Sequence, residues 1–114
     1  MEALPGEKKE SGPVRNLRSA PEETIRAIAE VEGPEWFAKQ DAIEKGVSSD
    51  GDYATSLLGA LERLENGRPA TFNGRGGVNR WYVAKDGTVS FSRTHAESEE
   101  HLAKAEELGF EIGS

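Results

Sequence analysis

The sequence contains no cysteine, which excludes a disulfide framework, a thiolate nucleophile and a thiolate metal site. It also lacks any hydrophobic run near the roughly 20 residues that a membrane-spanning helix requires. Its first residues include charged groups, Pro5 and Gly6 in place of an apolar segment, so no secretory signal is expected. The 114 residues suffice for one domain with a modest core. We therefore expect a cytoplasmic protein with no membrane partner.

Positive charge is scarce overall, but it is unevenly distributed. The formal net charge is −7, which does not favour binding to nucleic acid. Residues 21–66 carry −7 and residues 95–114 carry −5, whereas residues 67–94 carry +4. The one strongly basic segment contains Arg68, Arg75, Arg80, Lys85 and Arg93 against a single aspartate. Any contact with a polyanion is therefore expected there.

Residues 1–18 mix glycine, proline and charges without an apolar period, which predicts a flexible, disordered N-terminal arm. A first helix is then predicted from the capping box that begins at Ser19, with Pro21 in its first turn. Gly33-Pro34 ends this helix, and Trp36 and Phe37 follow as an apolar patch expected in the core.

A second helix is predicted from Ala38 to Lys45, followed by a tight corner. The stretch from Ala42 to Val47 places a small residue, a glycine four positions later and then an apolar residue, which matches a helix-turn-helix corner. A third helix from Asp52 to Glu65 has the strongest apolar stripe in the chain, with Asn66-Gly67 as its left-handed cap. The stripe comprises Ala54, Leu57, Leu58, Leu61 and Leu64.

Three strands are predicted over residues 70–73, 79–84 and 88–92, joined by turns at 74–78 and 85–87. Trp81, Val83, Val89 and Phe91 alternate onto one face, and Arg80 and Tyr82 are expected on the other. Tyr82 is the better candidate of the two adjacent aromatics for stacking on a single strand, because Trp81 is expected in the core. A last helix is predicted from a capping box at Thr94 to Leu108, with Phe110 folding back on it.

This order of elements, with the corner at residues 42–47 and the hairpin tip Gly74-Arg75-Gly76-Gly77, resembles the winged helix-turn-helix superfamily. The resemblance implies an α+β fold with a flexible arm over residues 1–18, a winged-helix domain over 19–92 and an extra C-terminal helix and tail over 93–114. It also implies that the third helix lies in the major groove of double-stranded DNA while the wing reaches a neighbouring groove or the backbone. The implied contacts are Ser48, Ser49, Thr55, Ser56 and Arg63 on the helix side, and Arg68, Arg75, Asn79 and Arg80 on the wing.

The function implied is a DNA-binding module, a regulator of transcription or of another DNA transaction, without a cofactor. A homodimer through the last helix is one alternative for its assembly, although that helix could equally pack on its own domain. The third helix has no Arg or Lys in its first two turns, and Asp50 and Asp52 place negative charge at its start. An acidic winged-helix module that binds a protein, or that mimics DNA, therefore stays open as the second interpretation.

Catalysis is not expected from this sequence. His95 and His101 lie six residues apart, so a helix would not present them on the same side, and no third residue of metal-ligand spacing accompanies them. No Ser-His-Asp order is present, and the glycines of the hairpin lack the lysine of a phosphate-binding loop.

Overall fold

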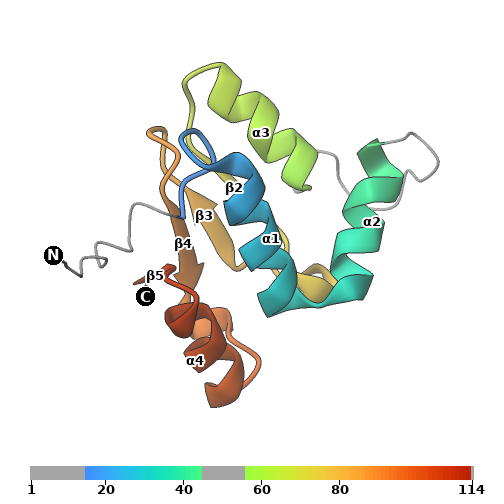
Figure 1. Cartoon of the computed structure of the whole chain (residues 1–114), viewed down its shortest axis with the longest axis vertical. Coiled ribbons are helices and arrows are strands. Elements are labelled where there is room, and N and C mark those ends of the chain that lie inside the picture. Colours follow the sequence, from blue (N-terminus) through green and yellow to red (C-terminus); the bar gives the residue numbers. More distant parts are fainter. Residues whose placement is uncertain (1–14, 45–55, 114) are drawn as a thin grey trace, which may run out of the picture.

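Four strands form one mixed sheet with four helices around it in the computed structural model, which describes residues 15–44 and 56–113 (Figure 1). The α+β class predicted from the sequence is confirmed. The helices are α1 (Pro21–Glu32), α2 (Pro34–Glu44), α3 (Leu57–Glu65) and α4 (Glu99–Glu107). The strands are β2 (Ala70–Phe72), β3 (Trp81–Val83), β4 (Val89–Ser92) and β5 (Glu111–Gly113).

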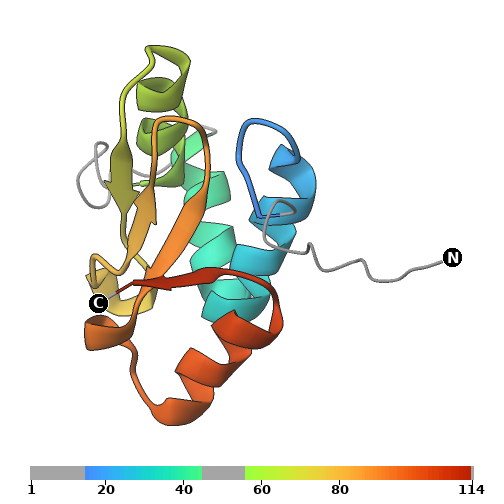
Figure 2. The same cartoon turned by 90° about the vertical axis from the view of Figure 1, so that its left-hand side faces the viewer.

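The sheet has the strand order β2-β3-β4-β5, and its first three strands are antiparallel, as the alternating pattern predicts. Tyr82 pairs with Thr71 on one side and with Ser90 on the other, which leaves Trp81 and Val83 on the buried face. The fourth strand was not predicted. β5 pairs in parallel with β4, so the chain after α4 returns to the sheet edge (Figure 2).

Aromatic side chains form the centre of the core. Trp81 stacks on Phe72 at 5.8 Å between ring centroids, and it meets Phe91 and Phe110 edge to face at 5.1 and 4.9 Å. Trp36 extends the group, with its ring 6.2 Å from that of Phe72 and its Nε1 donating to the carbonyl of Asn73 at 2.8 Å. Such pairs add to stability beyond the area that they bury.

The first helix has Pro21 in its first turn as predicted but lacks the predicted cap, and the second helix starts at Pro34, four residues before the predicted Ala38. α1 begins at Pro21, but its N-cap is Ala20 and no side chain caps it, so the capping box at Ser19 is wrong. The backbone amide of Ser19 instead donates to Oδ1 of Asn16 at 3.0 Å. Gly33, with φ of 102°, ends α1 as expected, and α2 then starts directly at Pro34. Of the adjacent aromatics in α2, Trp36 is buried whereas Phe37 is 47% exposed.

The third helix starts later than predicted. Its first residue is Leu57, because Ser56 has extended backbone angles and its hydroxyl accepts from the amide of Gly59 at 3.1 Å. Leu57, Ala60 and Leu64 are buried, while Leu58 and Leu61 are only partly covered. The cap at Asn66-Gly67 is confirmed, with φ of 73° at Gly67.

The last helix also has a different cap from the one predicted. Thr94 and His95 belong to a short 3-10 helix, η5 (Arg93–His95), and the N-cap of α4 is Ser98, whose hydroxyl accepts from the amide of His101 at 3.1 Å. Ala105 is fully buried against its own domain, as is most of His101. At least this face of α4 is therefore used within the chain and is not open to a dimer partner.

Residues 15–18 belong to the folded part of the chain and not to an arm. Asn16 forms a bridge with Thr88, and Leu17 is 4% exposed and packs in the core. Arg15 donates from Nε to the carbonyl of Leu108. The predictions for residues 1–14, for the corner at Gly46 and Val47 and for the apolar position at Ala54 lie outside the described residues. Within the described ranges, no helix combines the length and apolar character of a membrane span.

Candidate functional site

A carboxylate at the end of α1 organises the region where the wing was predicted. Glu32 is 1% exposed, and its Oε2 accepts from the indole Nε1 of Trp81 at 2.7 Å. Its Oε1 accepts from the backbone amide of Arg75 at 2.9 Å. Two hydrogen bonds from neutral donors compensate only part of the cost of burying this charge, so a cation is required nearby.

Arg80 supplies that cation from inside the protein. Its side chain is fully buried, and its Nε lies 3.1 Å from Oε2 of Glu32, although the N–H is not aligned for a hydrogen bond. The other guanidinium nitrogens donate to the carbonyls of His95, at 2.5 Å, and Arg75, at 3.1 Å. The prediction that Arg80 faces solvent on the wing is therefore wrong, because η5 and the loop that contains Arg75 cover its side chain.

Arg75 lies at the tip of the loop and is also engaged. It sits in the 3-10 turn η4 (Arg75–Gly77), and its Nη2 lies 2.9 Å from Oε1 of Glu97, with both side chains about two-fifths exposed. Its Nη1 donates to the backbone carbonyl of Glu32 at 3.1 Å. The second oxygen of Glu97 lies 3.4 Å from Nη2 of Arg80. Two arginines and two carboxylates thus form one network of balanced charge.

His101 closes this network from α4. Its Nδ1 accepts from the amide of Glu97 at 3.1 Å, which places the proton of the neutral ring on Nε2, 3.9 Å from Oε2 of Glu32. Burial lowers the pKa of His101 below its usual range; the negative charge of Glu32 opposes this effect, and the positive charge of Arg80 adds to it. At neutral pH the imidazole is therefore uncharged and adds no positive charge to the network.

The ion pair between Arg75 and Glu97 shifts the pKa of both residues. The hydrogen bond from Arg75 lowers the pKa of Glu97, and the charge of Arg75 acts in the same direction. Glu97 in turn raises the pKa of Arg75. Both groups stay charged across the physiological range, so the Arg75 charge is compensated at its own position.

The remaining predicted contacts lie outside this network. Arg63 and Arg68 are exposed near the end of α3 and before β2, and Asn79 is exposed before β3. Ser56 is buried as the N-cap of α3. Ser48, Ser49 and Thr55 lie outside the described residues.

Arg63 and Arg68 lie next to each other, because the amide of Arg68 donates to the carbonyl of Arg63 at 2.9 Å. Arg68 precedes β2 and Arg75 follows it, so about 10 Å of strand separates the two ends. The arrangement of the described residues gives an arginine pair neutralised by carboxylates, Arg75 and Arg80, and a second pair of neighbouring exposed arginines, Arg63 and Arg68, before β2. Among these residues, no group of three or more His, Asp or Glu side chains could hold a metal ion.

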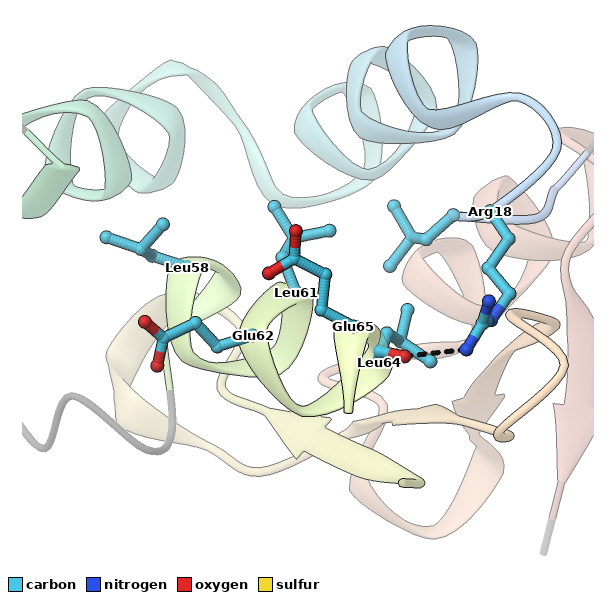
Figure 3. A pocket seen from close by; sticks show the side chains of 7 residues that line it. Arg18, Leu58, Leu61, Glu62, Leu64 and Glu65 are labelled. Atoms are coloured by element: carbon cyan, nitrogen blue, oxygen red, sulfur yellow. Dashed lines mark hydrogen bonds between the residues drawn. The ribbon is translucent and has the colours of Figure 1, made fainter. Parts of the chain in front are cut away.

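A second surface feature lies along α1, α2 and α3 and the segment just before α1. Three open hollows of about 370, 240 and 360 Å³ lie there, and we call them together the helical groove. The first and second hollows share Leu58 and Leu61, and the second and third share Ile25 and Phe37, so the three are continuous. Figure 3 shows the first hollow, with Leu58 and Leu61 projecting from α3 and Arg18, from the segment before α1, at one end.

Comparison with protein-family models, with curated proteins and with solved structures found no significant match.

Sequence reasoning missed two members of the buried network, Glu32 and His101. Glu32 follows Val31 at the end of an amphipathic helix and precedes Gly33, a position where a charged side chain is ordinarily exposed to solvent. One signal was available: Glu32 lies four positions after Ile28, which is fully buried, and therefore on the buried side of the helix. His101 lies likewise four positions before the buried Ala105.

Proposed function

We propose that this protein is a small acidic module that binds another protein, and that it does not bind double-stranded DNA. One observation carries the proposal: two of the four arginines expected to contact DNA, Arg75 and Arg80, are paired with Glu32 and Glu97. A phosphate would have to displace Glu97 from Arg75, and it could not reach the buried guanidinium of Arg80. Phosphate contacts supply most of the affinity of a duplex-binding protein.

The charge that remains also favours a protein partner. Once Arg75 and Arg80 are neutralised, residues 67–94 retain Arg68, Lys85 and Arg93 against Asp86. The chain as a whole keeps a formal charge of −7. An excess of carboxylates repels DNA and attracts basic partners, because long-range electrostatic steering follows the summed charge.

We further propose a winged-helix arrangement for α1, α2, α3 and the hairpin of β2 and β3. The order of three helices followed by an antiparallel hairpin supports it. A fold of this kind does not by itself set the function, which has to be argued from the surface. The surface argument here is the internal pairing of the wing arginines, so the winged-helix fold and a protein partner are compatible.

The test is an amide chemical-shift titration of the full chain with a generic duplex at about 50 mM and about 200 mM salt. We expect no shifts at either concentration, because non-specific electrostatic binding would appear first at low salt. Salt-sensitive shifts at Arg63, Arg75 and Asn79 would overturn the proposal and restore DNA binding. In that case replacing Arg75 by Ala should weaken binding to all sequences and flatten the salt dependence.

A second arm tests the positive half of the proposal. Selection from a displayed peptide library on the immobilised full chain should enrich a family of sequences that bind the folded protein and not the protein in urea. Failure to enrich any family, together with binding of the duplex, would leave no support for a protein partner.

A further inference from the structure

We propose that the helical groove binds an amphipathic α-helix of a partner protein, a helix with leucine-like side chains on one side and lysine or arginine beside them. This inference rests on the proposed function, since it names the partner's chemistry and the surface that receives it. Three observations support it: the continuity of the apolar lining, the exposure of that lining and the charges on its rim.

The lining leaves a connected group of apolar side chains partly exposed to solvent. Phe37 is 47% exposed, and Ile25, Ala29, Leu58 and Leu61 are only partly covered. Single exposed apolar residues are ordinary, whereas a connected group of them rimmed by polar residues marks an interaction site. The side chains come from α1, α2 and α3, so the groove runs across three elements whose other faces form the core.

The chemistry of the lining favours a helix over an extended peptide. Apart from Gln40, the uncharged side chains along the groove are apolar, namely Leu17, Ile25, Ala29, Phe37, Leu57, Leu58, Leu61 and Leu64. An extended segment would bury backbone amides and carbonyls here with few partners, which is costly. A helix satisfies its own backbone and presents only side chains, at spacings of three and four residues.

The rim of the groove selects the sign of the partner's charge. Three carboxylates lie along it, Glu22, Glu62 and Glu65, against the guanidinium groups of Arg18 and Arg26. Arg18 is directed to one end, because it donates to the carbonyls of Lys85 at 3.0 Å and Leu64 at 2.6 Å. Figure 3 shows Glu62 and Glu65 beside the leucines, with Arg18 apart from them. Basic side chains flanking the apolar face of the helix would complement this rim.

The probe is a synthetic helical peptide of about four turns, with leucine at positions i, i+3, i+4 and i+7 and lysine at the flanking positions. A matched peptide carries glutamate in place of each lysine. The readout is the dissociation constant for the full chain by fluorescence anisotropy, together with the map of amide shifts. We expect the lysine peptide to bind with shifts on α1, α2 and α3, and the glutamate peptide to bind at least tenfold more weakly.

Two pairs of variants locate the site. Phe37→Ser should weaken binding about tenfold, because half of a phenyl side chain would no longer be covered. Its control is Tyr82→Ser, an aromatic of the same 47% exposure on the sheet, which should leave binding unchanged. Glu62→Lys with Glu65→Lys should weaken binding and reduce its salt dependence. The control for charge reversal is Glu106→Lys with Glu107→Lys, also exposed and also in the last turn of a helix.

The outcomes separate this inference from the proposed function. Equal binding of both peptides would overturn the basic helix as occupant, and an effect of Tyr82→Ser without one of Phe37→Ser would overturn the groove. Concentration-dependent dimers that Phe37→Ser abolishes, with no peptide binding, would assign the groove to a second copy of this chain and overturn the inference. None of these results would restore DNA binding, which only the duplex titration can do.

Discussion

Replacing Glu32 by Ala should be the most damaging single change outside the aromatic core. The substitution removes the carboxylate but leaves the Arg80 guanidinium fully buried. It also removes the acceptor of the Trp81 indole and of the Arg75 amide. The variant therefore loses three interactions at one position.

The magnitude follows from the geometry. Removing one partner of a buried ion pair costs about 3–5 kcal/mol, because the remaining charge stays uncompensated. Here Glu97 moderates the loss, since its Oε2 lies 3.4 Å from Nη2 of Arg80, so the lower half of that range is expected. A domain of this size has a free energy of unfolding of about 5–15 kcal/mol, of which this is a large fraction.

The assay is urea unfolding followed by tryptophan fluorescence, because both Trp36 and Trp81 are buried and report on the core. The control is Glu30→Ala, an exposed glutamate of the same helix, which should change stability by less than about 0.5 kcal/mol. The double variant Glu32→Gln with Arg80→Met should cost less than the sum of its single variants, because no lone charge remains. A Glu32→Ala variant within about 1 kcal/mol of Glu30→Ala would refute the assignment of the ion pair as a structural element.

Three further predictions follow from the same network. Gly74→Ala should lower the free energy of unfolding by about 1–3 kcal/mol, because a Cβ there would collide with the Glu32 carboxylate and the Arg80 guanidinium. In the control Gly76→Ala, the new Cβ has no neighbour within 4 Å, so the variant should cost only the strain of its φ of 75°. An equal loss of stability in both variants would contradict the packing argument. The free energy of unfolding should fall as pH drops below about 6.5, because His101 is protonated in the unfolded chain while burial lowers its pKa in the folded protein. In a His101→Gln variant the urea midpoint should change less with pH between about pH 7.5 and 5. An unchanged pH dependence would argue against His101 as its source. Arg75→Ala should raise the pKa of Glu97 back toward its ordinary value, which a carboxyl NMR titration measures; no change would mean that the pair does not persist in solution.

The sequence alone determined the α+β class, the antiparallel order of the first three strands and the C-terminal ends of most helices. Those features depend on local or short-range rules: alternation places Trp81 and Val83 on one face, and glycine accepts the positive φ that ends a helix at Gly33 and Gly67. The apolar stripe predicted for the third helix is confirmed in part, since Leu57 and Leu64 are buried while Leu58 and Leu61 are only partly covered. The start of α3 at Leu57 depended on the hydroxyl of Ser56. Such caps compete over a few residues, so the pattern fixes an element better than its boundary.

Only the tertiary structure decided what the charged residues do. Arg80 reads as a solvent-facing strand residue, yet it lies in the interior because Glu32, 48 positions earlier, supplies a buried carboxylate. No local pattern encodes that pairing, since the two residues meet only when α1 packs beside β3. β5 was not predicted either, because its pairing with β4 depends on the path of the chain around α4. Charge pairing over long sequence separations therefore decided whether Arg75 and Arg80 are available to a partner.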